Sequence, residues 1–199
     1  MRVVVPVAAE RPKTRLADVL TGEERLEFAL AMLADVLRAV RGAGGDPEVL
    51  ATAPLEADAP VTVDDRPLTP AVNAALDDLP TSVVMADLPL ATPASLERLF
   101  ATAGDVVIAP GRGGGTNALV VRHSEFRADY HGGSFLKHRA AAAKLGSLGV
   151  VDSHRLATDV DERSDLVELL VHGDGAAADW LRDAGFELVE RESRLAVTR

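Results

Sequence analysis

Two acidic residues lie at points of the chain where they could bind a divalent cation. Asp87 directly follows the largely apolar stretch 82–86, and Asp161 lies in the acidic segment 159–165 together with Asp159. Carboxylate oxygens are preferred ligands of Mg²⁺, which takes its other ligands from substrate phosphates and water. One acid of this segment facing Asp87 would complete a magnesium site. The alternative is that Asp87 only caps a turn or helix, and that the acids of 159–165 form a solvated turn before a capped helix.

Two cations follow the first apolar run of the chain. Lys13 and Arg15 flank Thr14, a few residues after the valine-rich stretch 2–7. An arginine fork and a lysine point charge at the end of a strand could hold the oxygens of a phosphate. The alternative is a solvated turn whose cations pair with acids of the following helix.

A glycine-rich turn separates two apolar runs in "IAPGRGGGTNALVV", residues 108–121. Consecutive glycines let backbone N–H groups converge on an anion, and Arg112 and Thr116 add a charge and a hydroxyl. The spacing matches neither a P-loop nor a dinucleotide-binding fingerprint, because "TNALVV" is strand-like rather than helical. We therefore expect a turn that lies under an acidic substrate, with a flexible hairpin as the alternative.

A second glycine pair, in "YHGGSF", comes just before a probable helix. Ser134 could cap this helix, whose N-terminus after Gly133 would be a natural anion site; simple capping is the alternative. The histidines His131, His138 and His172 share no metal-ligand spacing such as H-E-x-x-H, so they are interpreted as structural or surface residues.

The elements that must position these residues alternate along the chain. Valine-rich and other apolar runs predict strands over 2–7, 47–52, 60–65, 81–87, 105–110, 116–122, 148–153, 186–191 and 194–198. Helical spacing of apolar residues predicts helices over 22–45, 69–79, 92–104, 134–146, 164–173 and 176–186. This alternation predicts one α/β domain over residues 1–199, with a largely parallel sheet covered on both faces. Ligands of such sheets bind beyond the carboxyl ends of the strands.

Composition excludes several classes of protein. The 199 residues are 47% hydrophobic, carry a formal net charge of −10 and include no cysteine. The acidic balance argues against nucleic-acid binding, and no apolar stretch is long enough to span a membrane, so we expect a cytoplasmic protein. Lysine occurs only at Lys13, Lys137 and Lys144. An acidic, lysine-poor surface is typical of proteins that work in molar salt, where charge repulsion is screened.

Five blocks of the sequence together resemble one known family. "KTRLA", "MADLPL", "IAPGRGGGTNAL", "YHGGSFLKH" and "DVDERSDLVELLVHG" resemble the 2-phospho-L-lactate guanylyltransferases of coenzyme F-420 biosynthesis. The matches run in order through nearly the whole chain, and the block around GGGTNAL is the most specific. Three positions depart from the family pattern: Ala8 stands in place of a frequent lysine, His131 in place of glycine and Arg163 in place of proline.

The resemblance implies a nucleotidyltransferase fold of the nucleotide-diphospho-sugar transferase type, which is Rossmann-like. It implies transfer of GMP from GTP to 2-phospho-L-lactate with release of pyrophosphate, and a homodimer. By the same resemblance Mg²⁺ would be held by Asp87 and by Asp161 or Asp159, with Asp161 favoured. Lys13, Arg15 and Asn73 would bind GTP, with Lys13 also catalytic. The phosphorylated acid would be held by Arg112, Gly115, Thr116, Gly133 and Ser134.

Three other functions stay open at this point. Phosphoenolpyruvate could replace phospholactate as the acceptor, because the two molecules differ only by a single two-electron oxidation. Nucleotidyl transfer to another phosphorylated acceptor is a second alternative, although the GGxSxR pattern usual in such relatives is absent from the first loop. A non-catalytic nucleotide-binding domain is the third, and retention of Asp87 and Asp161 argues against it.

Overall fold

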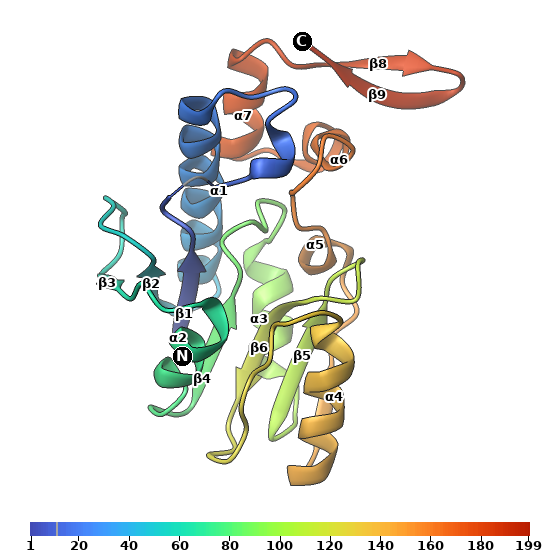
Figure 1. Cartoon of the computed structure of the whole chain (residues 1–199). Helices are drawn as coiled ribbons and strands as arrows, with labels where there is room; N and C mark the ends of the chain where they lie inside the picture. Colours follow the sequence, from blue (N-terminus) through green and yellow to red (C-terminus); the bar gives the residue numbers. More distant parts are fainter. Residues whose placement is uncertain (11) are drawn as a thin grey trace.

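The computed structural model describes residues 1–10 and 12–199. Its centre is a seven-stranded sheet, and a two-stranded sheet lies near the C-terminus (Figure 1). The strands are β1 (Arg2–Val7), β2 (Asp46–Ala51), β3 (Val61–Val63), β4 (Thr81–Val84), β5 (Val106–Pro110), β6 (Thr116–Val121), β7 (Leu148–Val150), β8 (Glu187–Arg191) and β9 (Arg194–Thr198). The helices are the 3-10 turn η1 (Thr14–Leu16), α1 (Gly22–Gly42), α2 (Leu68–Ala75), α3 (Pro93–Ala101), α4 (Ser134–Leu145), α5 (His154–Ala157), α6 (Asp165–His172) and α7 (Ala176–Asp183).

The large sheet is mixed but mostly parallel, as the alternation of elements predicts. Its strand order is β3-β2-β1-β4-β6-β5-β7. β1 lies parallel to both β2 and β4, while β6 is antiparallel to its neighbours β4 and β5. After β1 the chain forms β2 and β3 on one side and then returns to form β4 on the other side. The strand order therefore reverses between β1 and β4, which is where ligands bind in sheets of this kind.

Helices cover both faces of this sheet, because successive side chains of a strand point to opposite faces. On one face the buried Val5 of β1 belongs to a core with Val36 of α1 and Leu96 of α3. On the other face Ile108 of β5 lies in a core with Val72 of α2. The prediction of a sheet covered on both faces is confirmed.

The C-terminal helices pack on α1 rather than on the sheet. Phe28 of α1 shares a buried cluster with Leu169 of α6 and Leu181 of α7. The carboxylate of the buried Asp35 of α1 accepts hydrogen bonds from the first backbone N–H groups of α7, those of Ala176 at 2.8 Å and Ala177. This arrangement fixes α6, and with it the acidic segment that precedes α6.

Several predicted boundaries differ from the structure. β4 ends at Val84, so Asp87 lies in the segment that leaves the strand and not at its last residue. Gly133, in a left-handed conformation with φ of 61°, occupies the capping position of α4, so the prediction that Ser134 caps this helix is wrong. The strands β8 and β9 pair with each other in a separate sheet. Within residues 1–10 and 12–199, none of the helices has the length and apolar character needed to cross a bilayer.

Candidate functional site

Lys13, Asp87 and Asp161 form an ionic cluster at the carboxyl end of the sheet. The Nζ atom of Lys13 lies 2.8 Å from Oδ2 of Asp87 and 2.7 Å from Oδ1 of Asp161. The Lys13 side chain is only 9% exposed, and those of Asp87 and Asp161 are 28% and 36% exposed. Three residues that the sequence singles out separately thus meet at one point, with two carboxylate oxygens facing the same cation.

The backbone around the switch in strand order brings these three residues together. Lys13 follows β1 and has left-handed backbone angles, φ 53° and ψ 46°, just before the turn η1. Such angles are uncommon for a residue other than glycine and mark a local constraint. Asp87 follows β4, and its carbonyl accepts a hydrogen bond of 3.1 Å from the N–H of Val160. This bond holds the acidic segment, including Asp161, beside the end of β4.

The electrostatics of the cluster favour a further cation. Burial disfavours the charged ammonium, but Asp87 and Asp161 outweigh this effect and raise the pKa of Lys13. Burial raises the pKa of the Asp87 carboxyl, while the nearby Lys13 ammonium acts in the opposite direction. Two carboxylates that converge on one monovalent cation form a suitable oxygen ligand set for a divalent cation.

The cluster forms part of the wall of a cleft of about 240 Å³. This cleft is lined by Pro6, Val7, Ala8, Pro12, Lys13, Ala29, Met32, Met85, Ala86, Asp87 and Asp161. A neighbouring cleft of about 200 Å³ shares the wall formed by the end of β1 and Met85, and continues to Asp64, Arg66 and Leu68. A charged cavity and a more apolar one therefore adjoin each other at the switch point.

Asp159 and Asp161 have different partners. Asp159 Oδ1 accepts a hydrogen bond of 3.1 Å from Nδ2 of Asn117, and the same Asn117 amide donates to the carbonyl of Leu156. Asp161 instead contacts Lys13. Of the two acids that the sequence leaves open, Asp161 is the one that the structure brings to Lys13 and Asp87.

Arg112 and Arg15 lie on the far side of the acidic segment. Arg112 donates a hydrogen bond of 2.8 Å to Asp165, whose other carboxylate oxygen accepts from the backbone N–H groups of Asp161 and Glu162. Arg15 is 67% exposed, with its Nη1 3.5 Å from Oε1 of Glu162. Both arginines line a third, open cleft together with acids of the 159–165 segment, so side chains of both charges border the site here.

Two glycines of the turn between β5 and β6 are required, each for a different physical reason. A Cβ at Gly111 would lie 2.5 Å from Oδ1 of Asn117, so only glycine lets the backbone approach that amide. Gly114 has a φ of 78°, which other residues rarely adopt. The N–H of Gly111 donates to the carbonyl of Gly115, and the carbonyl of Gly114 accepts from the N–H of Phe135. The turn is thus joined to the start of α4, where Gly133 and Ser134 lie.

Thr116 is buried and receives its orientation from His138. Nε2 of His138 accepts a hydrogen bond of 2.8 Å from the backbone N–H of Asp129. Burial, the main cause, lowers the pKa of His138 to about 4, so the ring is neutral at pH 7 and its proton must be on Nδ1. Nδ1 therefore donates to Oγ1 of Thr116 at 2.9 Å. The Thr116 hydroxyl keeps its own proton, which it can donate to an anion.

The buried, neutral His138 predicts a specific loss of stability in mild acid. Its pKa is lowered from 6.5 to about 4 in the folded chain, so the unfolded chain binds more protons between these two values. The free energy of unfolding should therefore fall by up to about 3 kcal/mol as the pH drops from 6.5 to 4. Urea denaturation at several pH values measures this fall. It should shrink in His138→Gln and persist in the control variant of the exposed His131, His131→Gln; an equal fall in both variants would contradict the assignment.

Asn73 lies on α2 and is pinned to the loop before α4. Its Nδ2 donates to the carbonyl of Ala128 at 3.0 Å, and its Oδ1 accepts from the N–H of Ala128 at 2.7 Å. The predicted role of Asn73 in binding GTP stays a prediction, and these two bonds add a structural role to it.

Replacing Asn73 by alanine should lower the free energy of unfolding. The change leaves the N–H and the carbonyl of Ala128 without these two partners, at a cost of about 1 to 3 kcal/mol. Thermal unfolding measures this cost, and Ala74→Ser, a change at the adjacent exposed position of α2, is the control. An unchanged Tm in Asn73→Ala would contradict the structural role.

Three residues that organise the site lie outside the predicted set of site residues, and one of them, His138, has the structural role expected for it. Asn117 holds Asp159, Asp165 holds the backbone at Asp161, and His138 orients Thr116. A signal for Asn117 exists in the sequence, since it is a polar residue inside the otherwise apolar strand "TNALVV". No comparable local signal identifies the role of His138, because its contact with Thr116 joins two separate elements, α4 and β6.

The chain is similar to known proteins over its whole length. The family model described as "Guanylyl transferase CofC like" matches residues 1–199. A 2-phospho-L-lactate guanylyltransferase of Haloferax volcanii is 62% identical over 203 residues, covering 100% of this chain and 98% of its own length. One of Natronomonas pharaonis is 60% identical over 200 residues, covering 100% of this chain and 99% of its own length.

Solved structures share the fold at low sequence identity. A candidate nucleotide-diphospho-sugar transferase of Desulfovibrio desulfuricans G20 superposes with a TM-score of 0.66 at 18% identity, covering 92% of this chain and 94% of that one. A nucleotidyl transferase of Methanothermobacter thermautotrophicus gives a TM-score of 0.58 at 18% identity, covering 92% of this chain and 98% of that one. The fold is that of nucleotidyltransferases, and because the family model and the close relatives span the whole length, the chain belongs to the family of CofC-like guanylyl transferases.

Proposed function

We propose that the chain transfers GMP from GTP to 2-phospho-L-lactate, giving lactyl-2-diphospho-5'-guanosine and pyrophosphate. The observation that carries this proposal is the convergence of Asp87 and Asp161 on one cation at the switch point of the sheet. It stands in a chain that is 60% and 62% identical to proteins named for this reaction. The fold is that of nucleotidyltransferases, and the acceptor is taken from the relatives.

The reaction needs alignment and charge neutralisation more than proton transfer. A phosphate oxygen of 2-phospho-L-lactate attacks the α-phosphorus of GTP, a new P–O bond forms, and the bond to the pyrophosphate oxygen breaks. The attacking phosphate is already an anion, so no side chain has to remove a proton from it. The main obstacle is bringing two anions together, and fixed positive charge is the remedy.

The residues of the cluster fit a divalent cation such as Mg²⁺. Asp87 and Asp161 would hold it, because one oxygen of each already faces a shared positive charge. Asp159, held by Asn117, lies in the same segment and completes the acidic surroundings. When bound, the ion neutralises the charge of the triphosphate and of the transferred phosphoryl group.

Lys13 and Arg15 would bind the phosphates of GTP. The ammonium of Lys13 projects into the cleft from the loop after β1 and is almost fully shielded from solvent, with 9% exposure. Low exposure strengthens its attraction for an anion. Arg15 stands at the open border, where its exposed guanidinium, which lies 3.5 Å from Glu162, would turn toward the ligand. The adjoining cleft, with the apolar Leu68 and the polar pair Asp64 and Arg66, would accept the nucleoside, and Asn73 lies on the helix beside it.

The phosphorylated acid would lie on the opposite side, over the glycine-rich turn. Arg112 would supply positive charge at this border. The backbone of Gly115 lies beside Thr116. The hydroxyl proton of Thr116 is available, because His138 donates to the hydroxyl oxygen. Gly133 and Ser134 form the start of α4, next to the same turn. A helix N-terminus and a hydroxyl donor suit a small acid with a phosphate group.

Pyrophosphate release tests the proposed function directly. The purified chain is incubated with Mg²⁺ and GTP in molar KCl, with 2-phospho-L-lactate, phosphoenolpyruvate or no acceptor. We expect release that depends on phospholactate, and ATP in place of GTP tests the choice of base. A higher rate with phosphoenolpyruvate would show that phosphoenolpyruvate, and not phospholactate, is the preferred acceptor. No release with either acceptor, while GTP still binds, would overturn the proposed substrates.

A further inference from the structure

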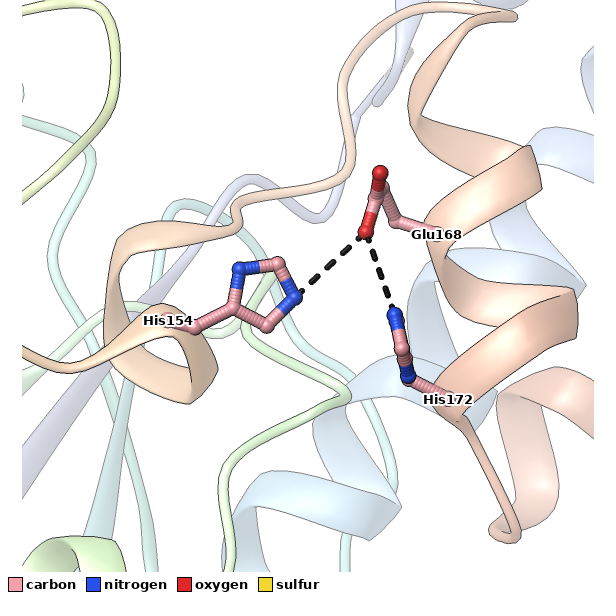
Figure 2. A group of neighbouring side chains, drawn as sticks. All are labelled: His154, Glu168 and His172. Atoms are coloured by element: carbon pink, nitrogen blue, oxygen red, sulfur yellow. Dashed lines mark ion pairs between the residues drawn. The ribbon is translucent and has the colours of Figure 1, made fainter. Parts of the chain in front are cut away.

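Three side chains outside the catalytic clefts converge at the junction of α5 and α6. His154 begins α5, and Glu168 and His172 lie on the same face of α6 at positions i and i+4. Oε2 of Glu168 is 3.4 Å from Nε2 of His154 and 3.6 Å from Nε2 of His172. Figure 2 shows the carboxylate facing both imidazole rings, which stand nearly perpendicular with an interplanar angle of 80°.

The distances suit metal ligands better than an ion pair. A charge-assisted hydrogen bond between imidazolium and carboxylate is about 2.7 to 2.9 Å long, clearly shorter than both separations. In a tetrahedral zinc site with bonds of about 2.0 to 2.1 Å, two ligand atoms lie about 3.3 Å apart. The two measured separations are close to that edge, and all three ligand atoms lie within 4.8 Å of one another. A small movement of two partly exposed imidazoles would complete the set.

The ligand types select the class of metal. Two imidazole nitrogens and one carboxylate oxygen suit Zn²⁺, Co²⁺ or Ni²⁺, whereas Mg²⁺ prefers oxygen ligands alone. The side chains of His154, Glu168 and His172 are 51%, 32% and 43% exposed, so an ion can enter from solvent and keep water as its fourth ligand. This chemistry differs from the all-carboxylate set of Asp87 and Asp161.

The position of the three residues suggests what the ion would do. His154 lies before the acidic segment that carries Asp159 and Asp161, and Glu168 and His172 lie after it. Arg155 already joins the two sides, since its guanidinium donates a hydrogen bond of 2.9 Å to the carbonyl of His172. A metal bridge at the same junction would hold the two ends of the segment together.

We propose that His154, Glu168 and His172 bind one divalent ion of the zinc class, which clamps α5 to α6 and stabilises the intervening segment. The site is independent of the proposed substrates. Its test uses the full chain without a polyhistidine tag, freed of metal by a chelator and titrated with Co²⁺ by visible absorption and with Zn²⁺ by calorimetry. Thermal unfolding and hydrogen exchange over residues 154–172 are followed with and without Zn²⁺.

Matched variants locate the ion. His154→Ala, Glu168→Gln and His172→Ala should each weaken Zn²⁺ binding by about tenfold or more and abolish the zinc-dependent rise in Tm. His131→Ala removes an exposed histidine elsewhere, and Asp58→Asn removes an exposed carboxylate far from both clusters; both should bind Zn²⁺ as the unchanged chain does. Wild-type binding in the three ligand variants, an equal loss in the two control variants, or no binding by the unchanged chain would each overturn the proposal.

Discussion

Asp87→Asn is expected to lower the rate of pyrophosphate release by about 10³-fold or more, without unfolding the chain. The amide has nearly the shape of the carboxylate but carries no charge, so the divalent cation would lose one of its two acidic ligands. Lys13 keeps Asp161 as a partner at 2.7 Å, and the backbone bond from Val160 to the carbonyl of residue 87 does not depend on the side chain. Because burial raises the pKa of Asp87, a neutral side chain should be tolerated there.

The measurement compares kcat and Tm of Asp87→Asn with those of a control aspartate variant. Asp58→Asn is suitable, because the Asp58 side chain is 94% exposed and pairs with Arg41 away from the ionic cluster. The control should keep its activity, and both variants should keep the circular dichroism of the unchanged chain. Near-normal turnover in Asp87→Asn would remove Asp87 from the metal site.

Lys13→Gln should have opposite effects on turnover and on metal binding. Turnover should fall by about 10²- to 10³-fold, because the shielded ammonium supplies fixed positive charge in the cleft proposed to hold the phosphates. In the absence of nucleotide, however, a divalent cation should bind more tightly to the variant. Asp87 and Asp161 then have no ammonium between them, and the incoming ion displaces no existing ion pair.

Mn²⁺ binding followed by electron paramagnetic resonance measures the second effect, and pyrophosphate release measures the first. Lys144→Gln is the control, since Lys144 is an exposed lysine of α4. A variant that loses activity but binds Mn²⁺ with unchanged affinity would show that the ammonium and the metal do not share the two carboxylates. A fully active variant would remove Lys13 from catalysis.

Local signals in the sequence account for most of the fold. Valine-rich runs and the helical spacing of apolar residues depend on near neighbours in the chain, and the structure contains the corresponding elements. One boundary that differs depends on the backbone conformation of a single residue. Gly133 rather than Ser134 caps α4 because its left-handed backbone makes the turn into the helix.

The sequence alone determined the alternation of strands and helices, the apolar faces they bury, and the residue types available at the ends of the strands. The chemistry of the segment left Asp159 and Asp161 open, and the family resemblance favoured Asp161. The tertiary structure gives the two acids different partners: it brings Asp161 to Lys13, 148 positions away in the chain, and Asp159 to Asn117. The tertiary structure also brings His154 close to Glu168 and His172. The physical reason is that hydrophobic periodicity specifies local geometry, whereas contacts between distant side chains depend on strand order and on how the helices pack.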